Sequence, residues 1–210
     1  MSGGAELGFT EHLFKVLVIG DHKVGKTSFV KRYVKNQFYE ELKMTIGVDF
    51  SMKVIDWDSH TRVRLQLWDI AGQERLRGLN RVFFKRSSGA LVVYDMTNGS
   101  TLDGALNWKH ELDSQVMLKN GRPIPAVLLA NKCDETKVCR RNASLLEKLC
   151  QEKGFIGWFQ TSAKENINVD EAAKFLVKHI LQNNEESVKE EEQNMQINLK
   201  QQSKSNSTCC

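Results

Sequence analysis

The stretch at residues 13–27, LFKVLVIGDHKVGKT, decides the fold. Residues 13–19 are rich in Val, Leu and Ile and are followed by a glycine, which predicts a short buried strand. Residues 20–27 fit the pattern GxxxxGK(S/T), and the amphipathic residues 26–35 predict a helix that begins at its end. Glycines in such a loop let backbone N–H groups approach phosphates, and the helix N-terminus faces the anion. Residues 20–27, called the phosphate loop below, are therefore predicted to bind phosphate between a strand and a helix.

The polar residues of the phosphate loop have expected roles. Lys26 can reach the β- and γ-phosphates of a nucleoside triphosphate, and the Thr27 hydroxyl can bind Mg²⁺. The expected nucleotide contacts of this segment are Lys23, Val24, Gly25, Lys26, Thr27 and Ser28. A chance match in an ordinary loop is the alternative, and the pattern does not say which base the nucleotide carries.

Short apolar runs alternate with longer amphipathic stretches along the rest of the chain. The further strands are expected at residues 50–55, 63–68, 90–94, 124–130 and 155–160, and the further helices at 101–114, 143–153 and 169–181. This alternation predicts an α/β fold with a mostly parallel sheet. We expect a short N-terminal extension at residues 1–11, one domain at 12–183 and a polar, flexible tail at 184–210.

The composition is that of an ordinary globular domain, with 40% hydrophobic and 27% charged residues in 210. No apolar run approaches the roughly 20 residues needed to cross a bilayer, and the N-terminus lacks the features of a secretory signal. The net charge of +4 is too small to indicate nucleic acid, so no nucleic-acid partner is expected. Cys133, Cys139 and Cys150 have no metal-ligand spacing and are expected to be reduced thiols.

Two polar segments follow the last two expected strands and predict a base pocket. The first contains Asn131, Lys132 and Asp134, and the second contains Ser162, Ala163 and Lys164. A single carboxylate at Asp134 can accept the N1–H and the 2-amino group of guanine, whereas adenine offers neither donor. Asn131 can address the other edge of the base, and the Ala163 N–H its carbonyl oxygen. Taken singly, Asp134 could instead cap a helix and Lys164 could be a solvated charge.

A third polar segment follows residues 63–68 and predicts hydrolysis. Asp69 can hold Mg²⁺ through water, the Gly72 N–H can bond a γ-phosphate, and Gln73 can orient the attacking water as the catalytic residue. Thr45 is a second hydroxyl for the metal. Loops that only a γ-phosphate and its metal hold should relax after hydrolysis. The alternatives are a surface glutamine at Gln73 and an ordinary strand-start residue at Thr45.

Residues 12–182 resemble the small GTPase superfamily and, within it, the Rab family. The resemblance rests on the five guanine-nucleotide motifs together with IGVDF at 46–50, WDIAGQER at 68–75, VVYDMT at 92–97 and the terminal Cys-Cys. Ile70 within WDIAGQER, with LLANKCD and GWFQTSAKENINVDEA, is similar to the Rab subgroup that serves lysosome-related organelles and melanosomes. The resemblance implies a G domain whose six-stranded, mostly parallel sheet has one antiparallel strand and helices on both faces.

The resemblance also implies a function. A membrane-anchored GTPase would cycle between GDP and GTP with Mg²⁺ and recruit effectors in the GTP state to direct vesicle trafficking and organelle biogenesis. Phe38 would pack on the guanine ring, effectors would read Ile46, Phe50, Trp68 and Phe83, and Cys209 and Cys210 would be prenylated. The implied partners are an exchange factor, a GAP, a Rab escort protein and a GDP dissociation inhibitor. The implied location is the cytoplasmic face of endosomal, lysosome-related, melanosomal or vesicle membranes, with a cytosolic inhibitor-bound pool.

The sequence departs from the Rab pattern at three places, and alternative functions stay open. His22 and Lys23 stand where most Rabs have a small residue and Gly, Leu76 where Phe or Tyr is usual, and Phe83-Phe84 where a Tyr pair is usual. Because His22 could crowd the attacking water, a slowly hydrolysing or pseudo-GTPase scaffold is the alternative function. A third hypothesis is a P-loop kinase or ATPase that uses ATP, but the residues at 131–134 fit guanine rather than adenine.

Overall fold

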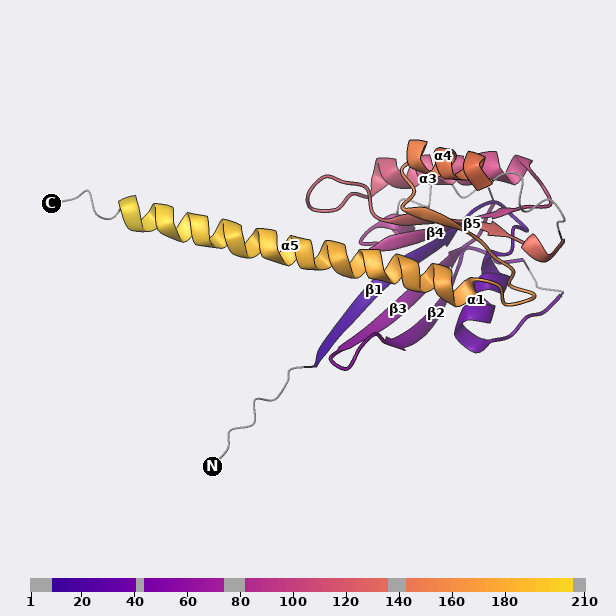
Figure 1. Cartoon of the computed structure of the whole chain (residues 1–210), viewed down its shortest axis with the longest axis horizontal. Coiled ribbons are helices and arrows are strands. Elements are labelled where there is room, and N and C mark those ends of the chain that lie inside the picture. Colours follow the sequence, from indigo (N-terminus) through magenta and orange to yellow (C-terminus); the bar gives the residue numbers. More distant parts are fainter. Residues whose placement is uncertain (1–8, 41–43, 74–81, 136–142, 206–210) are drawn as a thin grey trace, which may run out of the picture.

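A six-stranded sheet in the order β2-β3-β1-β4-β5-β6 forms the centre of the molecule (Figure 1). The computed structural model describes residues 9–40, 44–73, 82–135 and 143–205, with side chains as far as residue 187. The strands are β1 (Thr10–Ile19), β2 (Val48–Asp56), β3 (Thr61–Ile70), β4 (Gly89–Asp95), β5 (Ala126–Asn131) and β6 (Gly157–Gln160). β2 runs antiparallel to β3 and every other neighbouring pair is parallel, which confirms the expected architecture.

Helices cover both faces of the sheet. They are α1 (Lys26–Lys35), α3 (Ser100–Gln115), α4 (Ala143–Glu152) and α5 (Val169–Ser205), with a short 3-10 turn η2 at Cys133–Glu135. α1 and α5 lie on one face, and α3 and α4 on the other (Figure 1). The predicted bounds of α1 are confirmed; α3 extends one residue beyond the prediction at each end, and α4 ends one residue earlier than predicted.

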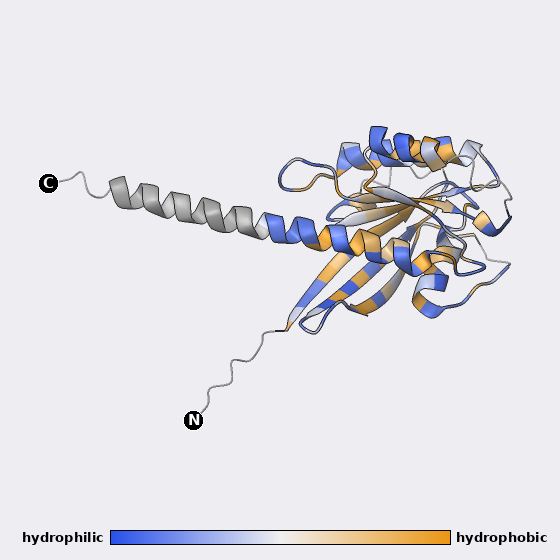
Figure 2. Cartoon of the chain, viewed as in Figure 1, coloured by the Kyte–Doolittle hydropathy of each residue, from blue (hydrophilic) through white to orange (hydrophobic). Residues whose placement is uncertain are grey.

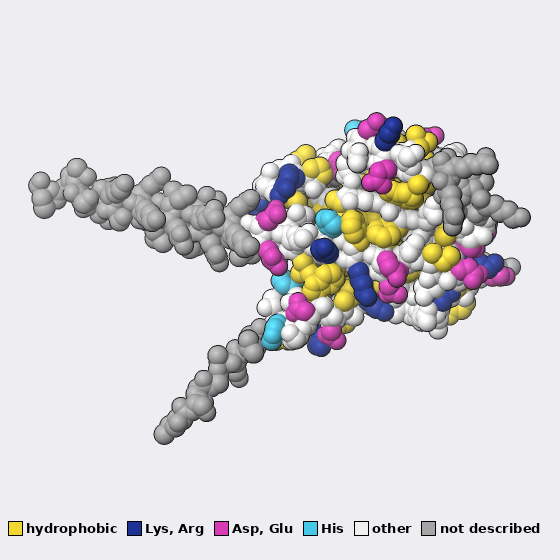
Figure 3. Space-filling model, viewed as in Figure 1, with side chains coloured by type: hydrophobic (Ala, Val, Ile, Leu, Met, Phe, Trp, Pro, Cys, Tyr) yellow, Lys and Arg dark blue, Asp and Glu magenta, His cyan; other side chains and the backbone are white. Residues whose placement is uncertain are grey.

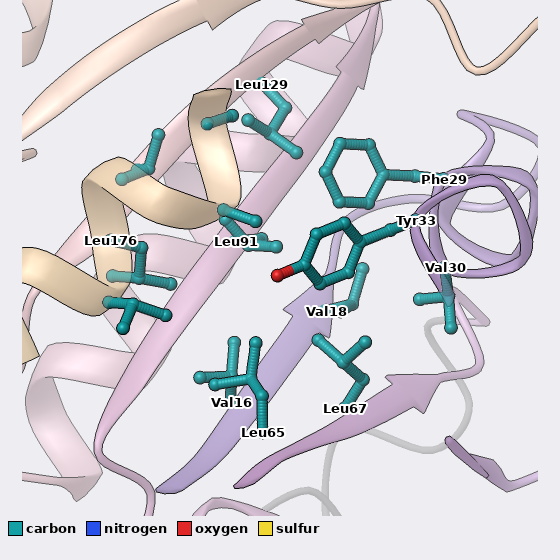
Figure 4. Close-up of a cluster of buried hydrophobic side chains, with 14 of the residues drawn as sticks. Val16, Val18, Phe29, Val30, Tyr33, Leu65, Leu67, Leu91, Leu129 and Leu176 are labelled. Carbon is teal, nitrogen blue, oxygen red and sulfur yellow. The ribbon is translucent and has the colours of Figure 1, made fainter. Parts of the chain in front are cut away.

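The core has two halves because successive strand residues point to opposite faces of the sheet. Val16 and Val18 of β1 pack toward α1 and α5, where Phe29, Tyr33 and Leu176 meet them (Figure 4). The alternate β1 residues pack with the residues of α3 and α4 on the other face. β4 and β5 are buried along their whole length, as expected for central parallel strands.

Two predicted strands begin later in the structure than in the sequence analysis. The N–H of Phe155 bonds to the carbonyl of Cys150 (2.9 Å) and closes the end of α4, so β6 begins only at Gly157. Pro125 has no N–H to donate to a ladder, and β5 begins directly after it at Ala126. β1 begins at Thr10, ahead of the expected domain start at residue 12.

The predicted end of the last helix at residue 181 is wrong, since α5 continues to Ser205. Among the described side chains, the last buried one in α5 is Leu181, and Figure 2 shows the helix turning hydrophilic as it leaves the sheet. The following residues, 182–205, contain no Gly or Pro and many Glu, Gln and Lys residues, which have a high propensity for helix. Arg122 Nη2 pairs with Glu186 Oε2 at 2.8 Å and ties this extension to the loop before β5. The flexibility of the tail stays a prediction.

The visible surface is chemically mixed. On the face in Figure 3, Lys and Arg side chains lie among Asp and Glu side chains with apolar side chains between them. Among the residues that the structure describes, no helix has both the length and the apolar character to span a bilayer.

Candidate functional site

A cavity of about 670 Å³ opens at the edge where β1, β4, β5 and β6 end. Ligands bind at this edge in open α/β sheets. Most predicted site residues line it: Lys23, Gly25, Lys26, Thr27, Ser28, Phe38, Thr45, Gly72, Gln73, Asn131, Lys132, Asp134, Ala163 and Lys164. Residues that were not expected to contact the nucleotide also line it, namely His22, Tyr39, Glu40, Met44 and Glu135.

Three predicted site residues, Val24, Asp69 and Ser162, do not line the cavity. The Val24 carbonyl accepts a hydrogen bond from Asn131 Nδ2 (2.9 Å), so the phosphate loop and the loop after β5 are tied together. The Ser162 hydroxyl accepts one from the Glu165 N–H (2.9 Å) and shapes the loop after β6. The buried Asn131 side chain therefore supports the site, in addition to lining it.

Lys26 is buried at the centre of the phosphate loop. Its ammonium donates hydrogen bonds to the carbonyls of Gly20 (2.9 Å) and Asp21 (2.7 Å). Burial lowers the pKa of Lys26 to about 8, although the carboxylates of Asp69 and Asp21 oppose the shift. A phosphate beside this ammonium would restore its charge and be neutralised by it.

The three predicted metal ligands converge on one point. The Thr27 and Thr45 hydroxyl oxygens are 2.9 Å apart. Both hydroxyls donate to Asp69 Oδ2, Thr45 at 3.4 Å. Burial raises the pKa of the Asp69 carboxyl, while the Thr27 hydrogen bond and the Lys26 charge oppose this.

This donor set fits Mg²⁺. Within the described part of the chain, Asp69 Oδ1 is buried with no hydrogen-bond partner, and a cation would satisfy it. No group of three or more His, Cys, Asp or Glu side chains suited to a metal occurs among the described residues. Few protein oxygens suit Mg²⁺, which keeps waters and binds substrate phosphates.

Asp95 and Lys132 form an ion pair at the base end of the cavity. Lys132 Nζ lies 2.6 Å from Asp95 Oδ2, and Asp95 Oδ1 accepts from the Thr97 N–H (2.8 Å) and hydroxyl (2.6 Å). Burial would raise the pKa of Asp95, but these hydrogen bonds outweigh it and hold the pKa below its usual value. The sequence analysis missed Asp95, although a carboxylate at the end of a parallel strand was a usable signal.

Asp134, the predicted base-binding carboxylate, is exposed and lines the cavity in η2. Ala163 and Lys164, from the loop after β6, line it as well. Arg32 of α1 donates hydrogen bonds to the carbonyls of both residues (2.7 and 2.9 Å). Sequence reasoning missed Arg32, because nothing in a helical pattern indicates a contact more than 130 residues away.

The segment at residues 72–73 contacts both the phosphate loop and Met44, near the expected position of the γ-phosphate. Gly72 lies against the phosphate loop so closely that a Cβ there would come within 2.5 Å of the Asp21 carbonyl carbon and of the His22 nitrogen. Gln73 Nε2 lies 3.1 Å from Met44 Sδ. His22 is exposed and lines the cavity beside them. Lys23 has a left-handed backbone (φ 65°), a conformation that favours glycine.

The residues expected to meet effectors form an aromatic patch, defined here as Ile46, Phe50, Trp68 and Phe83. The rings of Phe50 and Trp68 meet edge to face with centroids 4.5 Å apart, and Lys15 Nζ lies 3.5 Å from the Trp68 ring centroid. Ile46 is 90% exposed and Phe50 59% exposed. Trp68 and Phe83 are half-buried against the core, and Trp68 supports Phe50 through the ring contact. Leu76, Cys139, Cys209 and Cys210 lie outside the described residues.

A strand, a phosphate loop and a helix, with a cavity at the same edge of the sheet, define a P-loop nucleotide-binding domain. The model of the Ras family matches residues 15–182. The Ras-related protein Rab-32 of Sus scrofa is 56% identical over 203 residues, which cover 95% of this chain and 89% of the relative. The human Rab-32 is 54% identical over 95% of this chain and 90% of its own length. The human Ras-related protein Rab-7L1 is 43% identical over 97% of this chain and all of its own length.

The chain belongs to the Rab branch of the Ras family of small GTPases. It is a GTP hydrolase that binds guanine nucleotide and acts in vesicle trafficking with regulators and effectors.

Proposed function

We propose that this protein is a membrane-anchored switch that cycles between GDP and GTP and recruits effectors in the GTP state. The observation that carries the proposal is the convergence of Thr27, Thr45 and Asp69 at the cavity that Gly72 also lines. Two segments far apart in the sequence, at residues 44–45 and 72–73, meet where a γ-phosphate and its metal would lie. A ligand at that point would order both segments, and its loss would release them.

Different residues of the site have different roles in GTP hydrolysis. Mg²⁺, held by the two threonine hydroxyls and Asp69, would neutralise charge on the phosphates. Lys26 binds the β- and γ-phosphates, the Gly72 N–H donates to the γ-phosphate, and Gln73 orients the attacking water. Catalysis of this kind depends on position and charge rather than on covalent chemistry.

Base selection rests on three features of the pocket. The Asp134 carboxylate accepts the N1–H and the 2-amino group of guanine. The Ala163 N–H donates to the base carbonyl, and Phe38 packs on the ring. Support comes from the position of all three on the cavity wall.

The aromatic patch is the proposed effector surface. Its most exposed member, Ile46, directly follows Thr45 in sequence, and Phe50 lies five residues on in β2, so a change in the position of Thr45 would first displace Ile46. Aromatic residues on a firm base make strong binding anchors. We assign an exchange factor, a GAP, an escort protein for prenylation and a dissociation inhibitor as its regulators.

Prenyl groups on Cys209 and Cys210 would anchor the protein. Two chains are needed, since one gives only marginal membrane residence. The proposed sites are the cytoplasmic faces of endosomes, vesicles and lysosome-related organelles such as melanosomes, with a cytosolic inhibitor-bound pool.

A slowly hydrolysing scaffold is the second candidate. The observation that favours it is His22 on the cavity wall, next to the backbone contact with Gly72. Gln73, Thr45 and Asp69 are all present, which favours turnover. The two candidates differ in the lifetime of bound GTP rather than in which partners bind.

The test of the switch is a comparison of captured proteins. The full chain is loaded with a non-hydrolysable GTP analogue or with GDP and passed through the same lysate. We expect proteins that bind the analogue-loaded form only, and we expect Phe50→Ala to lose them while Val54→Ala, also exposed on β2, keeps them. Identical capture in both nucleotide states would contradict the switch.

A further inference from the structure

The guanidinium of Arg32 joins three parts of the nucleotide site. Its Nε and Nη2 donate to the carbonyls of Ala163 (2.7 Å) and Lys164 (2.9 Å) in the loop after β6. Its Nη1 donates to the carbonyl and to Oδ1 of Asn36, both at 3.1 Å. Arg32 itself belongs to α1, the helix that begins at the phosphate loop.

The loop contact uses a property that only arginine has. The planar guanidinium presents several N–H donors in a fixed geometry, so two neighbouring carbonyls can be held at once. Lysine would offer a point charge with freely rotating donors. Ala163 and Lys164 line the cavity, so Arg32 holds the backbone of the base pocket from behind.

The contact with Asn36 acts on the opposite side of the base. Asn36 caps the end of α1 in a left-handed conformation (φ 54°), and its N–H bonds to the Arg32 carbonyl at 2.9 Å. The chain leaves this cap toward Phe38, which lines the cavity. One side chain thus fixes both the loop that faces the base edge and the start of the segment that faces the base plane.

We propose that Arg32 is a positioning residue for guanine binding, which holds the Ala163 N–H in line with the oxygen at position 6 of the base. The inference rests on the base contacts proposed above. Arg32 does not line the cavity, so it acts through the loop after β6 and through the cap at Asn36. Its loss should weaken recognition of position 6 more than recognition of position 2, which belongs to Asp134.

The test compares three nucleotides on the full chain. GDP is the reference. In 6-thio-GDP only the atom facing Ala163 changes, and IDP lacks only the amino group that faces Asp134. Arg32→Met keeps much of the side-chain length but removes the donors, and Arg32→Lys keeps the charge without the fork. Arg122→Met is the matched control, because Arg122 forms an exposed ion pair with Glu186 away from the site.

The expected result is a selective change. Arg32→Met should release GDP about tenfold faster than wild type, because the loop after β6 loses the charged hydrogen bonds that hold the carbonyls of Ala163 and Lys164. The preference for GDP over 6-thio-GDP should shrink several-fold, while the preference for GDP over IDP stays as in wild type. Arg32→Lys should be intermediate, and it serves as the main variant if Arg32→Met does not fold. Arg122→Met should match wild type throughout.

Other outcomes overturn the inference. Equal weakening of all three nucleotides would mean that Arg32 only stabilises the fold. A wild-type protein that binds GDP and 6-thio-GDP equally would mean that the position of Ala163 has no consequence. Failure of the wild type to bind GDP at all would instead contradict the proposed function, so the two failures are distinguishable.

Discussion

The indole Nε1 of Trp108, on α3, donates a hydrogen bond to Asp21 Oδ1 of the phosphate loop at 3.1 Å. The Asp21 carbonyl in turn accepts from Lys26. α3 approaches the loop closely because residue 104 is glycine: a Cβ there would lie 1.8 Å from Asp21 Oδ2. The conformation of the phosphate loop therefore depends on a helix that does not itself touch the nucleotide cavity.

Gly104→Ala should weaken nucleotide binding. The added methyl must displace Asp21, and overpacking of this kind costs about 1–3 kcal/mol. We expect guanine-nucleotide affinity to fall by roughly tenfold and the melting temperature of the loaded protein to fall by several degrees. Gly99→Ala is the control, because a Cβ at residue 99 meets nothing within 4 Å. Equal behaviour of the two variants in a dissociation assay would contradict the role of α3.

His22 should slow hydrolysis of bound GTP. An imidazole beside the attacking water can displace Gln73, and a misplacement of about 1 Å can cost on the order of 100-fold in rate. In single-turnover assays, His22→Ser should be faster than wild type and Gln73→Leu slower. Lys23→Gly, which fits the left-handed backbone, should hydrolyse GTP at the wild-type rate. A His22→Ser variant no faster than wild type would rule out steric obstruction, and a Gln73→Leu variant equal to wild type would favour the scaffold.

The two described cysteines should differ in reactivity. Burial, helped by the Glu147 carboxylate, raises the pKa of the Cys150 thiol to about 11. The folded protein thus keeps Cys150 protonated where an ordinary thiol, with a pKa near 8.5, already ionises. Near neutral pH an alkylating reagent should modify the half-buried Cys133 and leave Cys150 intact until the protein is denatured. Peptide mass spectrometry reads out both sites, and equal labelling rates in the folded protein would contradict the prediction.

The raised pKa of Cys150 also determines how the stability of the folded protein changes with pH. Because the folded pKa of Cys150 lies above the unfolded value, its contribution to stability is complete below the unfolded pKa. It is lost as pH rises from there toward 11.

Membrane residence should require the two terminal cysteines. A double variant Cys209→Ser and Cys210→Ser should move to the soluble fraction of cells, because no lipid would remain to hold it. Cys139→Ser is the control and should fractionate like wild type. Persistent membrane association of the double variant would contradict lipid anchoring.

Local chemistry made much of the fold predictable. The strand, loop and helix around residues 13–35 follow from apolar runs and one glycine-rich pattern, and the structure places α1 at the predicted residues. Thr27 lies at the start of an expected helix and Asp69 directly follows an expected strand, so both could be assigned to the metal, whereas Thr45 lies five residues before the expected strand at 50–55 and was assigned as a second hydroxyl for the metal. The prediction that the last helix ends at residue 181 was wrong, because it rested on the polarity of residues 182–205 and did not weigh their high helix propensity.

Long-range polar contacts were not predictable. The sequence pattern predicts that Arg32 is a surface residue of an amphipathic helix, yet its Nε donates a hydrogen bond to the carbonyl of Ala163 in the loop after β6. The Asp95–Lys132 pair and the Trp108–Asp21 bond likewise join residues whose patterns are independent of each other. Periodicity describes the face on which a residue lies, but the partner depends on how the elements pack.

The most direct test of the account is the nucleotide preference of Asp134→Asn. Asparagine can donate to the 2-oxo group of xanthine and no longer accepts both donors of guanine. In competition binding with the full chain, the variant should lose guanine-nucleotide affinity by at least about tenfold, the effect of one lost charged hydrogen bond, and gain affinity for xanthine nucleotides. Unchanged affinity and selectivity for guanine nucleotides would contradict the assignment of this cavity as the guanine site.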